Sequence, residues 1–243
     1  MKNALISGGA GGLGKAIALE LLQSGHRVFA ADLSNAETNF ESWKSTFDSE
    51  YLHFVVLDVT DYENCLAAVE QIESHGGVDV LVNAAGVTQD ISLRKMEPAQ
   101  WRKVLSVNLD GTFHLCRACI NGMIENGFGR VINISSVNGL QGQFGQTNYA
   151  ASKAGLHGLT MSLARETAAK GITVNSISPG YCDTEMVAAI PPEQLQKITA
   201  QIPVGRLAQP QEIARVVSFL AADDSAYITG ANIPVTGGYW MGF

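Results

Sequence analysis

Residues 3–14 read NALISGGAGGLG, an apolar run that passes directly into a glycine-rich turn. The run has the length and composition of a buried strand, and a helical pattern begins at Leu13. The glycines Gly8, Gly12 and Gly14 let the chain turn sharply. They also let backbone N–H groups approach a pyrophosphate at the positive end of the helix. Glycine turns serve as plain connections too, so this interpretation depends on the rest of the chain.

Strand-like runs and helix-length amphipathic segments alternate along the whole sequence. The expected strands are 3–7, 27–32, 52–59, 78–84, 129–136, 172–178 and 231–236. The expected helices are 13–24, 62–74, 98–126, 149–170 and 210–222. This pattern is typical of βαβ units, so we predict an α/β fold: one doubly wound, Rossmann-type domain over residues 1–243, with a seven-stranded parallel sheet flanked by helices. Residues 183–209, which contain three prolines, are expected to form a lid over a cleft.

The composition limits the class of protein. Of 243 residues, 46% are hydrophobic and 16% charged, which is typical of a globular domain. No apolar run reaches the roughly 18 residues of a membrane span, and the short run ALI after Lys2 is unlike a secretory signal. A formal net charge of -7 opposes a broad nucleic-acid surface. We therefore expect a soluble, cytoplasmic protein without a nucleic-acid or membrane partner.

The cysteines and histidines indicate no metal site. The pair in HLCRACI, Cys116 and Cys119, has the CxxC spacing, but no second pair or nearby histidine completes a zinc site. The pair falls inside a helical pattern, so we expect reduced cysteines. The five histidines are scattered without metal-ligand spacing.

Asp32, at the end of the second expected strand, indicates which dinucleotide binds. A carboxylate there accepts hydrogen bonds from the adenosine ribose hydroxyls and repels a 2′-phosphate. Its neighbours Gly11, Leu33, Ser34 and Asn35 offer no cation to that phosphate. We therefore predict NAD, with NADH preferred over NADPH. The alternative is a surface aspartate that caps a loop.

Ser136, Tyr149 and Lys153 form a candidate catalytic set. Tyr149 and Lys153 are four positions apart, so they share one side of a helix, although this spacing alone is weak evidence. Ser136 ends the preceding expected strand, and carboxyl ends of strands in an open α/β sheet face the ligand crevice. Reduction of a ketone by nicotinamide needs a proton donor at the oxygen. We expect Tyr149 to donate it, the Lys153 ammonium to lower the pKa of that phenol, and Ser136 to stabilise the developing alkoxide.

Six motifs in order carry a family resemblance: SGGAGGLG (7–14), NAAG (83–86), Asn108 in SVNLDG, Ser136, YAASK (149–153) and SPG (178–180). Together they resemble the short-chain dehydrogenase/reductases over the whole chain. The resemblance implies that Asn108 holds a water in a proton relay to Lys153, and that the protein is a homotetramer. It also implies a set of cofactor-binding residues: Gly8, Gly12, Leu13, Gly14, Asp32, Asp58, Val59, Asn83, Ala84, Ala85, Gly86, Tyr149, Lys153, Pro179, Gly180 and Thr184.

Within that family the sequence is most similar to the bacterial acetoacetyl-CoA reductases of polyhydroxybutyrate synthesis. The stretches that carry this likeness are GVTQD with LRKM (86–96), NISSVNGLQGQFGQTNYAASKAGLHG (133–158) and SPGY (178–181). The resemblance implies an acyl-CoA substrate and an (R)-3-hydroxybutanoyl-CoA product. The residues implied to line the acyl and pantetheine pocket are Asp90, Gln143, Phe144, Gly145, Gln146, Gly180 and Tyr181.

Other functions remain open on the sequence. A 3-oxoacyl-acyl-carrier-protein reductase shares nearly all of these motifs, and dehydrogenases of sugars, steroids or aromatic alcohols share the catalytic set. A non-catalytic NAD-binding sensor would be expected to lose one of Asn108, Ser136, Tyr149 and Lys153, and all four are present. The best-known acetoacetyl-CoA reductases use NADPH, whereas Asp32 in this sequence favours NADH.

Overall fold

The computed structural model describes residues 1–45, 47, 49–188 and 190–242, and in them seven parallel strands form one sheet. The strands are β1 (Asn3–Ser7), β2 (Arg27–Asp32), β3 (Leu52–Val56), β4 (Val80–Asn83), β5 (Gly129–Ile134), β6 (Ile172–Pro179) and β7 (Asn232–Val235). Their spatial order is β3-β2-β1-β4-β5-β6-β7, so the direction of winding reverses between β1 and β4. The predicted fold class is therefore confirmed.

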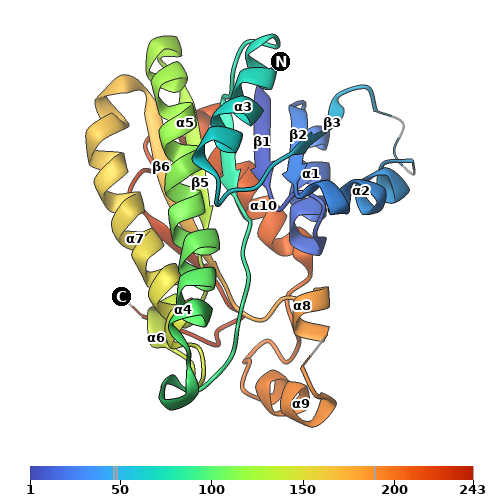
Figure 1. Cartoon of the computed structure of the whole chain (residues 1–243), viewed down its shortest axis with the longest axis vertical. Coiled ribbons are helices and arrows are strands. Elements are labelled where there is room, and N and C mark those ends of the chain that lie inside the picture. Colours follow the sequence, from blue (N-terminus) through green and yellow to red (C-terminus); the bar gives the residue numbers. More distant parts are fainter. Residues whose placement is uncertain (46, 48, 189, 243) are drawn as a thin grey trace.

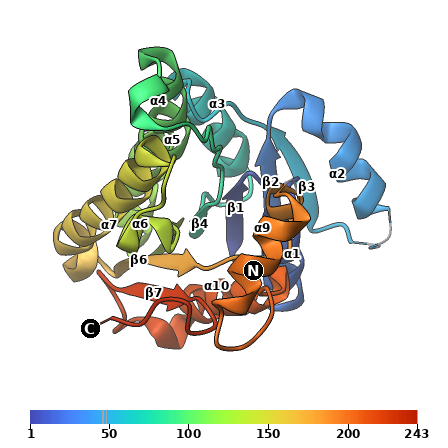
Figure 2. The ribbon, with the colours of Figure 1, turned by 90° about the horizontal axis from the view of Figure 1, so that it is seen from below.

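Helices cover both faces of this sheet, as Figures 1 and 2 show. They are α1 (Gly12–Gln23), α2 (Glu37–Lys44), α3 (Tyr62–Glu73), α4 (Pro98–Leu105), α5 (Gly111–Asn126), α6 (Asn138–Gln141), α7 (Thr147–Thr167), α8 (Glu185–Ala188), α9 (Pro192–Ala200) and α10 (Pro210–Ala221). Alternate residues of a strand point to opposite faces. Ala4 and Ile6 of β1 accordingly pack in one core cluster with α1 and α10, whereas Leu5 packs in another with α3 and α5.

Several helical regions differ from the prediction, among them the short helix α6, which was not expected. The segment expected as one helix over 98–126 is interrupted by a π-helical turn at Ser106–Asp110. Helix α2 was not expected, because only Phe40 and Trp43 are buried and so the apolar stripe is very short. The expected lid, 183–209, contains the two helices α8 and α9, which lie below the sheet in Figure 1. Ala189 of that segment is outside the described residues.

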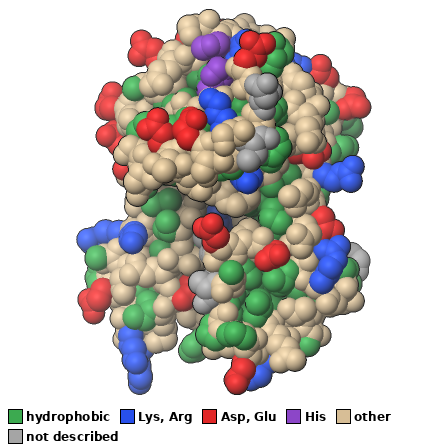
Figure 3. All heavy atoms as spheres, turned by 90° about the vertical axis from the view of Figure 1, so that its right-hand side faces the viewer, with side chains coloured by type: hydrophobic (Ala, Val, Ile, Leu, Met, Phe, Trp, Pro, Cys, Tyr) green, Lys and Arg blue, Asp and Glu red, His purple; other side chains and the backbone are tan. Residues whose placement is uncertain are grey.

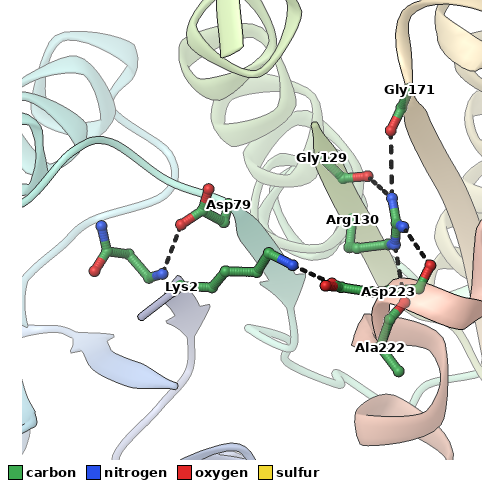
Figure 4. A network of polar contacts seen from close by, with 8 residues as sticks. Lys2, Asp79, Gly129, Arg130, Gly171, Ala222 and Asp223 are labelled. Atoms are coloured by element: carbon green, nitrogen blue, oxygen red, sulfur yellow. Dashed lines mark hydrogen bonds and ion pairs between the residues drawn. The ribbon is translucent and has the colours of Figure 1, made fainter. Parts of the chain in front are cut away.

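Buried polar contacts hold the sheet together at the end where the strands begin (Figure 4). The side chain of Arg130, 2% exposed, donates hydrogen bonds to four backbone carbonyls, those of Gly129, Gly171, Ala222 and Asp223. Lys2 forms an ion pair with Asp223 from the neighbouring side. Arg130 therefore joins the starts of β5 and β6 to the end of α10.

All four cysteines, Cys65, Cys116, Cys119 and Cys182, are buried and free, as expected for reduced thiols. Burial raises the pKa of each thiol, to about 12 at Cys65 and Cys116 and to about 11 at Cys182. Within the described part of the chain, no helix combines the length and apolar character that a bilayer crossing requires.

Candidate active site

A cavity of about 520 Å³ lies at the carboxyl ends of β1, β4, β5 and β6. This is the end of the sheet, beside the point where the winding reverses, at which open α/β sheets bind ligands. Figure 3 shows the hollow across the middle of one face of the molecule. Its walls come from the glycine-rich turn, the loops after β2, β4 and β5, the start of α7, and α8.

Two glycines make the turn after β1 compact. A Cβ on Gly9 would lie 2.7 Å from Cα of Ala30 in β2, and a Cβ on Gly14 would lie 2.0 Å from the carbonyl oxygen of Gly8. Any side chain at these positions would therefore push α1 away from the sheet. Gly8 has a φ of +68°, which side chains rarely adopt.

Two further glycines leave the start of α1 open toward the cavity. A Cβ on Gly11 would meet nothing nearer than 3.5 Å, and one on Gly12 nothing nearer than 3.9 Å, at Thr184. Gly11 is the N-cap of α1, so unpaired N–H groups of the first turn face this opening. The turn therefore fits an anionic group such as a pyrophosphate. Neither Gly9 nor Gly11 was predicted to shape this turn, although both stand in the same motif, and Gly11 was named only because it carries no cation.

Asp32 lines the cavity at the end of β2. Its Oδ2 accepts a hydrogen bond from the backbone N–H of Ala10 (3.1 Å), and its Oδ1 accepts one from that of Leu33 (2.9 Å). The carboxylate thus braces the turn, yet it has further lone pairs for ribose hydroxyls. Among the described cavity-lining residues, Lys153 is the sole lysine or arginine, and it lies with Tyr149 instead of beside Asp32.

Most of the other residues implied for the cofactor also line the cavity. These are Gly8, Gly12, Leu13, Gly14, Asp58, Val59, Ala84, Ala85, Gly86, Tyr149, Lys153, Pro179, Gly180 and Thr184. Asn83 is the exception, because it does not line the cavity. Its Nδ2 donates to Oδ1 of Asn133 on the adjacent strand (2.9 Å), so its amide is buried within the sheet, beneath the cleft.

Ser136, Tyr149 and Lys153 come together on one wall of the cavity. Tyr149 and Lys153 project from the first turns of α7, and Lys153 Nζ lies 5.6 Å from the centroid of the Tyr149 ring. That Nζ donates a hydrogen bond to the carbonyl oxygen of Ile134 (2.8 Å). Ser136 follows directly after Ser135 at the end of β5 and lines the same cavity.

The protonation of this pair differs from the expectation. Burial raises the pKa of Tyr149, a hydrogen bond with Ser136 lowers it, and the carboxylate of Asp90 raises it. Burial also lowers the pKa of Lys153 to about 8. The net shift of the Tyr149 pKa is therefore upward, with burial as its largest cause, whereas the sequence led us to expect a downward shift. The Lys153 ammonium donates to Ile134, and its effect on the phenol stays a prediction.

Asn108 lies in the π-helical turn and is fully buried. Its Oδ1 accepts from the N–H of Val87 (2.8 Å), and its Nδ2 donates to the carbonyl of Val87 (3.0 Å) and to Oγ of Ser152 (3.1 Å). The amide thus ties the loop after β4 to α7. A Cβ on Gly86 would lie 3.4 Å from Lys153 Nζ and 3.5 Å from Asn108 Oδ1, so these two groups flank Gly86.

The residues implied for the acyl pocket divide into two groups. Asp90, Gln146, Gly180 and Tyr181 line the cavity. Gln143, Phe144 and Gly145 do not line it, and Phe144 is 90% exposed, so their contact with the substrate stays a prediction. The reason is local: Gly142 and Gly145 both have positive φ, and the loop between them turns Phe144 outward.

Asn138 lines the cavity but was not predicted. Its backbone N–H donates to Ser136 Oγ (3.1 Å), and its Nδ2 donates to Oε1 of Gln146 (2.9 Å). Asn138 follows Ser136 by two residues in SSVNG, and this position could have indicated that it lies at the site. Glu185, Val187 and Ile190, in and just after α8, also line the cavity and were hidden in the proline-containing segment.

Comparisons with known proteins agree with this geometry. A family model described as "Enoyl-(Acyl carrier protein) reductase" matches residues 8–240. An acetoacetyl-CoA reductase of Allochromatium vinosum is 47% identical over 241 residues, 98% of this chain and 98% of that protein. A 3-oxoacyl-acyl-carrier-protein reductase of Pseudomonas aeruginosa is 45% identical over 243 residues, 99% of this chain and 98% of that protein. The crystal structure of gox2181 superposes with a TM-score of 0.92 at 35% identity and covers 98% of this chain and 95% of that one. The chain therefore belongs to the short-chain dehydrogenase/reductase family.

Proposed function

We propose that this protein reduces the 3-oxo group of acetoacetyl-CoA to (R)-3-hydroxybutanoyl-CoA, with NADH preferred over NADPH. The observation that carries the proposal is the meeting of Ser136, Tyr149 and Lys153 in the cavity that the glycine-rich turn also lines. Several similar relatives, at 45–47% identity over nearly the whole chain, are named acetoacetyl-CoA reductase. Asp90, Gln146 and Tyr181 supply polar and aromatic surface for a short acyl thioester.

The residues of the chain divide the work of reduction. A nicotinamide cofactor held along the glycine-rich turn and Asp32 would supply the hydride. Ser136 would donate a hydrogen bond to the 3-oxo oxygen, and Tyr149 would pass its proton to that oxygen. Because burial raises the pKa of Tyr149, the phenol stays protonated at neutral pH, as an acid in the reducing direction must. Lys153 would bind the ribose next to the nicotinamide.

Exchange of Tyr149 tests the proposal at its centre. In Tyr149→Phe the ring remains and the proton donor is lost, so turnover of acetoacetyl-CoA should fall at least about a hundredfold. Binding of NADH, followed by fluorescence, should be retained. Equal turnover by the variant, or failure of the parent enzyme to reduce any 3-oxoacyl thioester, would contradict the proposal.

A second candidate is a 3-oxoacyl-acyl-carrier-protein reductase. Its specific support is the Pseudomonas aeruginosa relative, whose 45% identity is close to that of the acetoacetyl-CoA reductases. Initial rates with acetoacetyl-CoA and with the same acyl group on acyl-carrier protein would separate the two. We expect the coenzyme A thioester to have the higher kcat/KM.

The proposal also covers the domain organisation, cellular location and oligomeric state of the enzyme. The chain would act as one catalytic domain, with 183–209 as its lid, in the cytoplasm and in polyhydroxybutyrate precursor synthesis. We propose a homotetramer, in support of which Phe113 on α5 and Met161 on α7 expose more than half of their surface. Light scattering on the purified protein would measure its mass.

A further inference from the structure

On the substrate side of the cavity, hydrogen bonds link Asp90, Gln146, Asn138 and Ser136 in that order, the last of them through the backbone N–H of Asn138. Gln146 Nε2 donates to Oδ2 of Asp90 (2.7 Å), and Asn138 Nδ2 donates to Oε1 of Gln146 (2.9 Å). The backbone N–H of Asn138 then donates to Oγ of Ser136 (3.1 Å), which lines the cavity together with Tyr149. This chain of hydrogen bonds begins in the loop after β4 and ends at the proton donors.

The charge of Asp90 fixes the direction of the two side-chain hydrogen bonds, from Gln146 to Asp90 and from Asn138 to Gln146. A carboxylate only accepts hydrogen bonds, so Gln146 must present its NH₂ group to Asp90 and its carbonyl oxygen to Asn138. Asn138 must in turn present its own NH₂ group to Gln146. Ser136 Oγ accepts the N–H of Asn138, which leaves the serine proton free to be donated.

An unpaired acceptor shows that this direction is enforced. Oδ1 of Asn138 is buried and has no hydrogen-bond partner among the described residues. A buried carbonyl oxygen without a hydrogen-bond partner is destabilising. The amide keeps this orientation because rotation would place Oδ1 against Oε1 of Gln146, two acceptors in contact.

We propose that Asp90 acts, through Gln146 and Asn138, as a positioning residue for the proton donors Ser136 and Tyr149, a role that rests on the proposed reduction and goes beyond lining the acyl pocket.

Electrostatics support the same role. The groups that face the Tyr149 side chain are Ser136, Asp90 and Lys153, and the Asp90 carboxylate raises the pKa of both Tyr149 and Tyr181. Removal of that negative charge lowers the pKa of Tyr149. Reduction requires the protonated phenol, so its upper pH limit should move to lower pH in a variant without the charge.

The test is the variant Asp90→Asn. Its side chain has nearly the same size, but it lacks the negative charge and no longer fixes the direction of the hydrogen bonds. We expect kcat for acetoacetyl-CoA to fall about tenfold or more. The high-pH limb of kcat should move to lower pH. Glu166→Gln, which removes an exposed carboxylate at the far end of α7, is the matched control and should match the parent enzyme in both respects. Thermal unfolding of each variant would verify folding.

A double variant tests the chain directly. In Asp90→Asn/Gln146→Glu the first bond reverses, but a carboxylate oxygen still accepts from Asn138, so kcat should recover toward the parent value. If Asp90→Asn raises only KM and leaves kcat and its pH profile unchanged, Asp90 merely lines the pocket and the proposal is overturned. Absence of recovery in a folded double variant would equally contradict it.

A titration without substrate or cofactor separates this proposal from the proposed function. Tyrosine labelled with ¹³C at Cζ reports the ionisation of Tyr149 by NMR, with Tyr149→Phe to assign the signal. In Asp90→Asn the signal should titrate at lower pH than in the parent. An unchanged titration would overturn the positioning role even if the enzyme reduces acetoacetyl-CoA. A shifted titration in a protein that reduces no 3-oxoacyl thioester would contradict only the proposed function.

Discussion

At the scale of single residues, we assign two tasks to the Asp32 carboxylate, bracing of the turn and the proposed binding of the cofactor ribose. Its oxygens brace the turn through the N–H groups of Ala10 and Leu33, and its position at the cavity also suits ribose hydroxyls. The two roles weighed from the sequence, loop cap and cofactor ligand, are therefore compatible. An exchange of Asp32 should affect both cofactor choice and the shape of the turn.

We expect Asp32→Ala to lower kcat/KM with NADH roughly ten- to a hundredfold, because a hydrogen-bonded charge of this kind contributes about 1.5–3 kcal/mol. Efficiency with NADPH should rise, since the repulsion of a 2′-phosphate is removed. Initial rates with both cofactors would measure the change. Glu37→Gln, an exposed acid on the first turn of α2, is the control and should leave the ratio unaltered. Equal efficiencies in the parent enzyme would contradict the assignment of Asp32.

At the scale of elements, the strands and the larger helices followed from the sequence because each carries its own periodic apolar pattern. Three expected strands end early, at Val56, Asn83 and Ile134, because the residues after them leave the sheet to line the cleft. Helices α2, α6 and α8 are too short or too exposed for a visible pattern. The π-helical turn within the segment 98–126 arises from tertiary contacts of Asn108, which no local periodicity encodes.

That the candidate catalytic residues line one cavity was predictable for a different reason. Ser136, Tyr149 and Lys153 are fixed by the end of β5 and the start of α7, both regular elements. The position of Phe144 was not predictable, because it depends on the conformations of Gly142 and Gly145 in a loop. A family resemblance predicts which residues stand at the site, but it does not predict the direction in which a loop side chain points.

An exchange of Arg130 would measure how much its hydrogen bonds stabilise the fold. In Arg130→Met four backbone carbonyls lose their donor, so we expect the free energy of unfolding to fall by about 2–4 kcal/mol. Urea unfolding would measure it. Arg165→Met, on the exposed side of α7, should cost less than about 0.5 kcal/mol. A similar effect of both exchanges would show that the Arg130 contacts contribute little.

At the scale of the whole molecule, the active site reduces stability. Burial lowers the pKa of Lys153 from 10.5 to about 8, so between these pH values the unfolded chain binds more protons at this residue than the folded one. The free energy of unfolding therefore gains a contribution that rises with pH across this window. At neutral pH the buried charge costs about 3 kcal/mol on this basis.

Lys153→Met should consequently be more stable than the parent protein at pH 7 while losing turnover. The difference in free energy of unfolding between the two should shrink as the pH rises from about 8 to 10.5. Denaturant unfolding at a series of pH values measures this difference, and Lys170→Met, an exposed lysine after α7, serves as the control. Parallel stability curves for parent and Lys153→Met would refute the expectation.

The buried thiols have a practical consequence for such experiments. Because a thiol reacts as its thiolate, four inaccessible cysteines with raised pKa values react very slowly with maleimides or iodoacetamide at neutral pH. One cysteine introduced on an exposed helix would therefore accept a fluorophore while the native four stay unlabelled. Motions of α8 and α9 could then be followed optically in the otherwise unaltered protein.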